Sequence, residues 1–443
     1  MNGNGADDQF KFVNPHLMKP PYFSRRNSLP TVLVLACGLF MCGCASDRGR
    51  KLAGPVKDAP SPHSAEFAQA AGTVLGQGFV DGNGIITLTN GDRIFPAMLS
   101  AIRGARQTIN FETYVFYDGD IGRKFTEALA ERARAGVKVH ILLDAQGTHK
   151  MGMKNVFILR DAGAVVEKYH TSFWWDVRRY NNRTHRKLLI VDGRIGFIGG
   201  VGIADEWEGN AASPDQWRDN HYRVTGPVVA ELQALFMDNW LKTKNEVLVG
   251  PDYFPPLAPA GPYRAQAFKS SPQYGENGIS LMYHMALASA RESILIENAY
   301  FVPDDLTRQD LIDAARRGVK VEVLVPGPHI DQKAVRWASQ RHWRALLQSG
   351  VKIYEYQPSM VHVKLLVVDG VFTSVGSGNF DNRSSRLNDE ANMNVISRAF
   401  ATEQSRLFEK DKRRSREATL DKSGHLLVND VVQQTAGLAS PQL

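Results

Sequence analysis

The sequence predicts an α/β protein of two homologous lobes, related by internal duplication and packed around one shared active site. Helical stretches alternate with short β-branched runs in each half, which is typical of α/β layering with crossover connections. A segment rich in Pro, Gly and Ser (246–279) separates the halves. Four blocks recur in the same order in both halves, and the first and last pairs are AIRGARQTINFETYVF (101–116) with ALASARESILIENAYF (286–301), and THRKLLIVDG (184–193) with VHVKLLVVDG (361–370).

The chain begins with the layout of a bacterial secretory signal in residues 1–44. Arg25 and Arg26 precede a short apolar run, small residues and Cys44. The sequence MCGC resembles a lipobox, whose last cysteine is acylated, and the alternative is an uncleaved signal anchor. Because stable attachment needs more than one acyl chain, acylated Cys44 predicts a lipid-anchored protein that faces the periplasm. Ala45 favours the outer membrane under the usual lipoprotein sorting rule.

Composition shifts predict the remaining boundaries. Residues 45–75 are small, polar and proline-dotted, and predict a tether. The predicted lobes and tail follow, with 76–245 as the first lobe, 246–279 as the linker, 280–425 as the second lobe and 426–443 as a C-terminal tail.

The net charge indicates the class of partner, and the positions of the cysteines exclude two kinds of site. The formal net charge of +7 over 443 residues suits an anionic partner, either nucleic acid or an acidic lipid surface. All three cysteines, Cys37, Cys42 and Cys44, lie near the N-terminus, so the predicted lobes contain neither disulfides nor a cysteine metal site.

The last repeated block carries the same ionisable residues in both halves. In the first copy, His185 and Lys187 are two apart, so on a strand they point to the same face. Asp192 follows an apolar run and begins an Asp-Gly turn, which should return small residues to the His–Lys end. The alternative, buried core histidines on two homologous strands, is disfavoured by the double occurrence. The second copy comprises His362, Lys364 and Asp369, followed by Ser377 and Asn379.

This pattern predicts phosphodiester transfer. Two lysines supply fixed positive charge to the non-bridging phosphate oxygens in the transition state. Two histidines that titrate near neutrality can divide the work, because one attacks phosphorus to form a phosphohistidine and the other serves as acid and base. No cofactor or metal is expected, since the sequence shows neither an obvious carboxylate cluster for magnesium nor a His/Cys cluster for zinc.

Other residues are expected to support the histidines and the substrate. A nucleophilic histidine needs an acceptor on its second ring nitrogen, and Asp219 after the first motif and Glu390 after the second are candidates. Ser377 and Asn379 are candidates for phosphate or substrate binding. Asp192 and Asp369 are expected to brace the turns rather than contact substrate.

The two motifs, their trailing small residues and the duplication resemble the phospholipase D superfamily, whose motif is called HKD. Within it, FETYVFYDGDIGRKFTEAL, THRKLLIVDGRIGFIGGVGIADEW and NFDNRSSRLNDE resemble bacterial cardiolipin synthases, and the likeness covers about residues 80–420. The resemblance implies phosphatidyl transfer between phosphatidylglycerol molecules, with His185 as nucleophile and His362 as acid/base. Gly202 departs from the family pattern, which has Asn at that position, whereas the second copy keeps Asn379.

An insert before the first motif, HTSFWWDVRRYNNR (170–183), mixes aromatic and basic residues. Such a mixture suits a membrane interface with anionic phospholipid, although it could also stack bases or cap the lobe. Three alternatives therefore remain beside the synthase: a phospholipase D hydrolase, a nuclease of the same superfamily, and an inactive phospholipid-binding scaffold. Nucleic acid is the less favoured partner, and the oligomeric state is left open.

Overall fold

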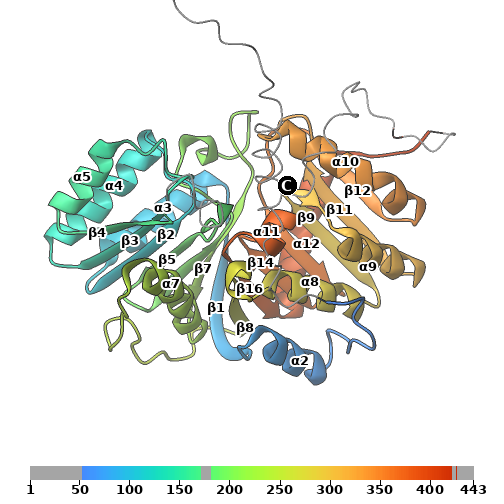
Figure 1. Ribbon diagram of the computed structural model, residues 1–443, viewed down its shortest axis with the longest axis horizontal. Coiled ribbons are helices and arrows are strands. Elements are labelled where there is room, and N and C mark those ends of the chain that lie inside the picture. The colour runs from blue at the N-terminus through green and yellow to red at the C-terminus, as the bar shows by residue number, and fades with distance from the viewer. Residues whose placement is uncertain (1–51, 171–180, 422–425, 427–443) are drawn as a thin grey trace, which may run out of the picture. The chain divides into compact units, whose positions relative to one another are not determined.

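The computed structural model describes residues 52–170, 181–421 and 426. Its main element is a fifteen-stranded sheet, in which β1 and β8 run antiparallel and join the two halves of the chain. Figure 1 shows β1 and β8 side by side between the two groups of strands. Within the described ranges, no helix is both long and apolar enough to span a bilayer.

The strand order repeats on the two sides of this junction. From the junction outward the order is β1-β7-β6-β5-β2-β3-β4 on one side and β8-β16-β14-β13-β9-β11-β12-β17 on the other. The first set is β1 (Val80–Thr89), β2 (Thr108–Thr113), β3 (Lys138–Asp144), β4 (Val165–Tyr169), β5 (Leu188–Val191), β6 (Ile195–Gly199) and β7 (Asn220–Thr225). The second set is β8 (Tyr263–Ser270), β9 (Ser293–Asn298), β11 (Lys320–Pro326), β12 (Lys352–Tyr356), β13 (Lys364–Val368), β14 (Phe372–Gly376), β16 (Glu390–Ile396) and β17 (Ser415–Glu417).

Helices cover both faces of the strands, as α/β layering requires. In Figure 1, α3 and α4 lie on one side of the first group of strands and α7 lies on the other. The helices of the first half are α3 (Gly91–Gly104), α4 (Asp120–Arg134), α5 (Met153–Asp161) and α7 (Val228–Lys244). Those of the second half are α8 (Gly278–Ser289), α9 (Asp305–Arg316), α10 (Lys333–Gln348), α11 (Asn382–Arg386) and α12 (Arg398–Lys412), and a small parallel pair is formed by β10 (Phe301–Val302) and β15 (Phe380–Asp381).

The apolar runs of the two motifs are explained by burial on both faces of the sheet. Along β5, Leu188 and Ile190 belong to the core under α7, whereas Leu189 and Val191 belong to the core under α3 and α4. β13 alternates in the same way between two cores. A strand buried on both faces reads as a continuous apolar run, and the His and Lys of each motif lie at or just before the start of that run.

Two segments assigned to irregular chain contain regular structure. Within the predicted tether, residues 65–75 form helix α2 (Ala65–Leu75), because Ser64 accepts a hydrogen bond from the Phe67 N–H at 3.2 Å and Phe67 is fully buried against Phe372. Within the predicted linker, residues 263–270 form β8, a central strand between β16 and β1. The first run of Pro and Gly residues in the linker ends at Pro262. Ala265 and Ala267 of β8 are small enough for the packed interior.

The predicted Asp-Gly turns are present, and both are type I′-like. Asp192 and Gly193 have φ of 52° and 60°, and Asp369 and Gly370 have φ of 50° and 59°. Each aspartate also binds the backbone of the preceding helix–strand turn. Asp192 accepts hydrogen bonds from the N–H groups of residues 106, 107 and 108, and Asp369 from those of residues 291, 292 and 293. These carboxylates therefore brace the fold, in line with the expectation from the sequence.

Candidate active site

The two His-Lys pairs lie at the starts of β5 and β13. β5 runs antiparallel to β2, while β2 and β3 are parallel, so the start of β5 lies at the same edge as the ends of β2 and β3. The strand geometry expected from the sequence is only partly present, since His185 and Lys187 precede β5 rather than belong to it.

Each motif is connected through its backbone to the other lobe. The His185 N–H donates to the Asp389 carbonyl at 2.8 Å, and the Asp389 N–H donates to the Arg183 carbonyl at 2.8 Å. In the second copy, the His362 N–H donates to the Arg218 carbonyl at 2.7 Å. These bridges fix each motif, through backbone alone, to the segment of the other lobe that carries Glu390 or Asp219.

The histidine–carboxylate pairs cross between the lobes. His185 Nδ1 lies 2.9 Å from Glu390 Oε2, and His362 Nδ1 lies 2.9 Å from Asp219 Oδ2. Each carboxylate predicted from the sequence is therefore present, but it holds the histidine of the other half. With Nδ1 engaged as a donor, Nε2 of each ring carries the lone pair.

Gly200 allows the crossing. A Cβ at this position would lie 2.5 Å from Asp219 Oδ1 and 2.8 Å from the His362 carbonyl oxygen. Both distances are too short for a real contact, so a side chain here would push Asp219 away from His362. The small residues after the first motif are expected from the sequence to let a ligand approach the backbone, whereas Gly200 allows close packing between the lobes.

The two carboxylates differ in how they are held. Glu390 accepts hydrogen bonds from Ser377 Oγ at 2.5 Å and Ser384 Oγ at 2.7 Å. Burial raises the pKa of Glu390, but its contact with His185, the positive charge of Lys187 and the Ser377 hydrogen bond outweigh burial, so the pKa lies below its ordinary value. Asp219 accepts from Trp207 Nε1 at 3.0 Å, and burial raises its pKa to about 6.

Burial controls the ionisation of the cationic groups. It lowers the pKa of His185 to about 4 and holds that of His362 well below its ordinary value. It also lowers the pKa of Lys187 to about 7 and of Lys364 to about 8. The expectation of histidines that titrate near neutrality is therefore wrong for the protein without substrate, because both rings are removed from water and face lysine ammonium groups.

The lysines are anchored to their own motifs. Lys187 Nζ donates to the His185 carbonyl at 2.6 Å and lies 5.3 Å from the centre of the Tyr114 ring. Lys364 Nζ donates to the His362 carbonyl at 2.7 Å and also lies 2.9 Å from Nδ1 of the same ring. Each ammonium is thus fixed beside its histidine.

A cavity of about 520 Å³ is lined by residues of both motifs, including His185, Lys187 and His362. Asn379 lines it, is 3 % exposed, and has an Oδ1 without a hydrogen-bond partner among the described residues. Ser377 is fully buried, and its hydroxyl is used by Glu390, so the structure places it behind the carboxylate rather than on the cavity wall. The predicted substrate role therefore suits Asn379, and Ser377 has a supporting contact instead.

The cavity wall contains residues that the sequence analysis did not select. Trp207 and Trp217 lie with ring centres 5.3 Å and 5.5 Å from that of His362, and Tyr114 lies 5.1 Å from that of His185. The position of Trp217 two residues before Asp219 was the available sequence signal for that tryptophan. The other charged and tyrosine residues on the wall are Tyr117, Lys150, Arg183, Glu206, Tyr300, Asp331, Asp381 and Arg383.

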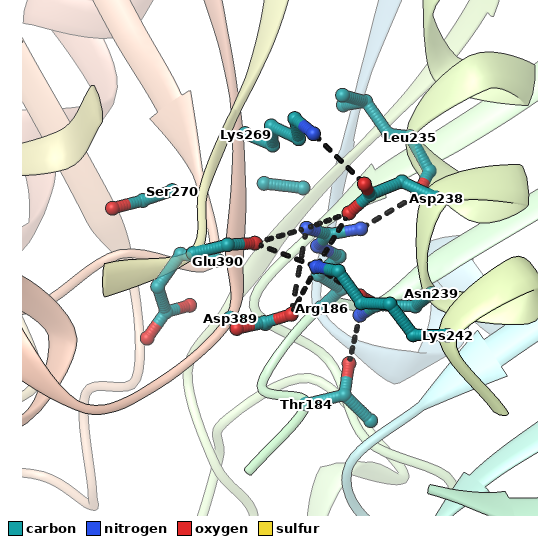
Figure 2. Close-up of polar contacts among 12 residues, drawn as sticks. Thr184, Arg186, Leu235, Asp238, Asn239, Lys242, Lys269, Ser270, Asp389 and Glu390 are labelled. Carbon is teal, nitrogen blue, oxygen red and sulfur yellow. Dashed lines mark hydrogen bonds and ion pairs between the residues drawn. The ribbon is translucent and has the colours of Figure 1, made fainter. Parts of the chain in front are cut away.

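A buried ionic network supports the His185–Glu390 pair from behind (Figure 2). Arg186, the middle residue of the first motif, is fully buried and its guanidinium donates to Asp238 Oδ2 at 3.1 Å. Lys242 donates to Asp238 Oδ2 at 2.8 Å and to Asp389 Oδ2 at 3.0 Å. Because Asp389 immediately precedes Glu390, this network fixes the backbone that carries the carboxylate.

Comparisons with known proteins decide the family. The family model described as cardiolipin synthase, PLD-like domain, matches residues 98–211 and 283–412, so it covers both halves and more than half of the chain. The chain belongs to the PLD-like cardiolipin synthase family. This confirms the resemblance drawn from the sequence and identifies an enzyme of the phosphatidyltransferase type within the phospholipase D superfamily.

Relatives of the PLD-like cardiolipin synthase family are similar over most of the chain. Cardiolipin synthase A of Pseudomonas fluorescens is 35% identical over 344 residues, which are 77% of this chain and 71% of that protein. Cardiolipin synthase 2 of Bacillus anthracis is 34% identical over 361 residues, 81% of this chain and 70% of that protein. The crystal structure of a phosphatidylserine synthase from Haemophilus influenzae has a TM-score of 0.60 at 14% identity and covers 79% of this chain and 91% of its own, which shows a shared fold.

Two predictions fall outside the described residues. The first is the acylation of Cys44 after the signal segment. The second is the role of the aromatic and basic core of the insert, residues 171–180.

Proposed function

We propose that this protein is a cardiolipin synthase that transfers a phosphatidyl group from one phosphatidylglycerol to the glycerol hydroxyl of another. The observation that carries the proposal is the crossed pair of histidine–carboxylate contacts around one cavity, His185 with Glu390 and His362 with Asp219. A single shared active site follows, because each half lacks the carboxylate that orients its own histidine.

In the first step, His185 Nε2 attacks the phosphorus of the donor. The phosphorus–oxygen bond to the departing glycerol breaks, and His362 gives that oxygen a proton. The neutral His185 that burial favours is the nucleophilic form. The negative phosphodiester raises the pKa of His362, so substrate binding supplies the protonated acid.

In the second step, the acceptor hydroxyl gives its proton to His362 and attacks the same phosphorus. The phosphorus–nitrogen bond to His185 breaks, which regenerates the starting enzyme and releases cardiolipin. Lys187 and Lys364 stabilise the charge on the phosphate oxygens in both steps. The two steps together consume two phosphatidylglycerol molecules and yield cardiolipin and glycerol.

His185 is the better candidate for the nucleophile. The imidazole that bonds to phosphorus acquires positive charge, and an ionised carboxylate on its Nδ1 stabilises that charge. Glu390, whose pKa is below its ordinary value, offers this more fully than Asp219, whose pKa is raised to about 6. Family precedent assigns the same role to the first histidine.

The experiment incubates the purified protein with labelled phosphatidylglycerol, with and without ethanol. Cardiolipin as the main product supports the synthase, and phosphatidylethanol reports transfer to a small alcohol. Phosphatidic acid alone would make the protein a hydrolase. DNA cleavage without any lipid product would make it a nuclease.

We further propose that acylated Cys44 attaches the protein to a bacterial membrane on its periplasmic side, the outer membrane being favoured by Ala45. Cys44→Ser should move the protein from the membrane fraction to the soluble fraction and leave activity in detergent unchanged. Continued membrane attachment of the variant would overturn the anchor.

A further inference from the structure

Two arginines from different lobes, Arg183 and Arg383, line the catalytic cavity on the His185 side. Both share this lining with Tyr114 and His185, and their positive charges oppose the rise in the Tyr114 pKa that burial causes. The Tyr114 ring in turn meets the His185 ring edge to face at 5.1 Å. The two guanidinium groups therefore belong to the wall beside the nucleophile.

The backbone or side chain of each arginine is fixed by contacts from the opposite lobe. The Arg183 carbonyl accepts the Asp389 N–H at 2.8 Å, and Arg183 is 4 % exposed. Arg383 Nη1 donates to Asn181 Oδ1 at 3.2 Å, and its Nη2 donates to the Asn181 carbonyl at 3.3 Å. Both positions are thus set by the junction that also sets the catalytic pairs.

The two arginines add more positive charge than the transferred phosphate requires. That phosphodiester carries one negative charge, and Lys187 and Lys364 are already fixed beside the two histidines. A water or ethanol acceptor brings no charge, whereas an acceptor phospholipid brings a second phosphodiester. The planar guanidinium matches phosphate oxygens with two parallel hydrogen bonds, which an ammonium group cannot do.

We propose that Arg183 and Arg383 bind the phosphodiester of the acceptor lipid, so that the cavity selects a phospholipid over water or a small neutral alcohol as acceptor. This inference rests on the proposed function and adds the residues that determine acceptor choice. The shared chemistry is a phosphodiester next to a free hydroxyl, which phosphatidylglycerol supplies, whereas ethanol supplies the hydroxyl without the phosphodiester.

The test is a competition between acceptors in mixed micelles. Labelled phosphatidylglycerol serves as donor, and unlabelled phosphatidylglycerol and ethanol are offered as acceptors. For Arg383→Gln we expect the ratio of cardiolipin to phosphatidylethanol to fall by about 10- to 100-fold, which is the loss of a charge-assisted hydrogen-bond pair. Arg383→Lys should recover part of the ratio, because lysine keeps the positive charge but cannot donate the two parallel hydrogen bonds.

The matched control is Arg386→Gln on the same short helix. Arg386 lies 3.7 Å from Asp304 in an ion pair and does not line the catalytic cavity. The control should keep the wild-type ratio, and circular dichroism should show that each variant is folded. Arg183→Gln is the second variant, and it should shift the ratio in the same direction.

The outcomes separate the inference from the proposed function. If both products fall together in Arg383→Gln, the arginines serve the donor phosphate, and the inference is wrong while the synthase stands. An unchanged ratio also overturns it. If the wild-type protein yields phosphatidylethanol but no cardiolipin, the proposed function itself fails.

Discussion

The two halves share a strand order, yet their catalytic histidines lie in different surroundings. His185 faces an ionised glutamate held by two serine hydroxyls, whereas His362 faces an aspartate whose pKa is raised to about 6. Lys364 contacts the ring of its own histidine, whereas Lys187 lies over Tyr114. The difference shows that a shared strand order does not give the two histidines equal electrostatic surroundings, which is what the proposed division of roles requires.

The contrast extends to the residue between histidine and lysine. Arg186 is fully buried in the network of Figure 2, while the equivalent Val363 is apolar. The second pair is backed instead by Arg218, which forms an ion pair with Asp411 at 2.7 Å across the lobes. Both histidines thus have an ionic support from two lobes, built from different residues.

The largest expected effect is the loss of either histidine. His185→Ala and His362→Ala should each lower kcat by about four orders of magnitude or more, because neither step of the relay can omit its partner. Steady-state cardiolipin synthesis measures this. Near-normal turnover in either variant would reject a division of labour between the halves.

The lysines should come next. Lys187→Ala and Lys364→Ala should each cost about 2–4 kcal/mol of transition-state stabilisation, the range for a fixed electrostatic donor. The protonated ammonium is the active form, and the lowered pKa values of about 7 and about 8 mean that charge is lost as pH rises through that window. We therefore expect kcat/KM to decline above about pH 7, and kcat to decline at higher pH because bound phosphate raises both pKa values. A kcat/KM that stays constant to pH 9 would contradict this assignment.

Replacing each of the two carboxylates tests the difference between the halves directly. Glu390→Gln should lower kcat by about 100-fold and Asp219→Asn by about 10-fold, because Glu390 contacts the proposed nucleophile and has the lower pKa of the two carboxylates. Stopped-flow or initial-rate assays at one pH give both numbers. A larger loss for Asp219→Asn would reverse the roles of the two halves.

The smallest catalytic effect is expected at the turns. Asp192→Ala and Asp369→Ala each leave three backbone N–H groups without their acceptor, so each should lower the free energy of unfolding by about 1–3 kcal/mol. Thermal unfolding measures the loss, and kcat well below the transition should stay close to that of the wild type. A severe loss of kcat in the folded variants would mean that these carboxylates act on substrate.

The duplication, the motif residues and both candidate orienting carboxylates could be predicted from the sequence, because repeated blocks and short spacings indicate them directly. It could not predict which carboxylate meets which histidine, since the crossing depends on how β1 and β8 join the sheets. The depressed pKa values of His185 and Lys187 depend on burial by distant segments, which local pattern does not contain. Arg383 was missed for the same reason, because it is far from His185 in the sequence and close to it only across the lobe junction.

The central claim is that both lobes act on one phosphorus atom, with His185 as the group that bonds to it. The most direct measurement uses His362→Ala and a phosphatidyl ester with a good leaving group such as 4-nitrophenol, followed by acid-free digestion and mass spectrometry. The account predicts a phosphatidyl adduct on His185 that accumulates because no base activates the acceptor. An adduct on His362 in the reciprocal His185→Ala variant, together with no adduct on His185 in His362→Ala, would contradict this assignment.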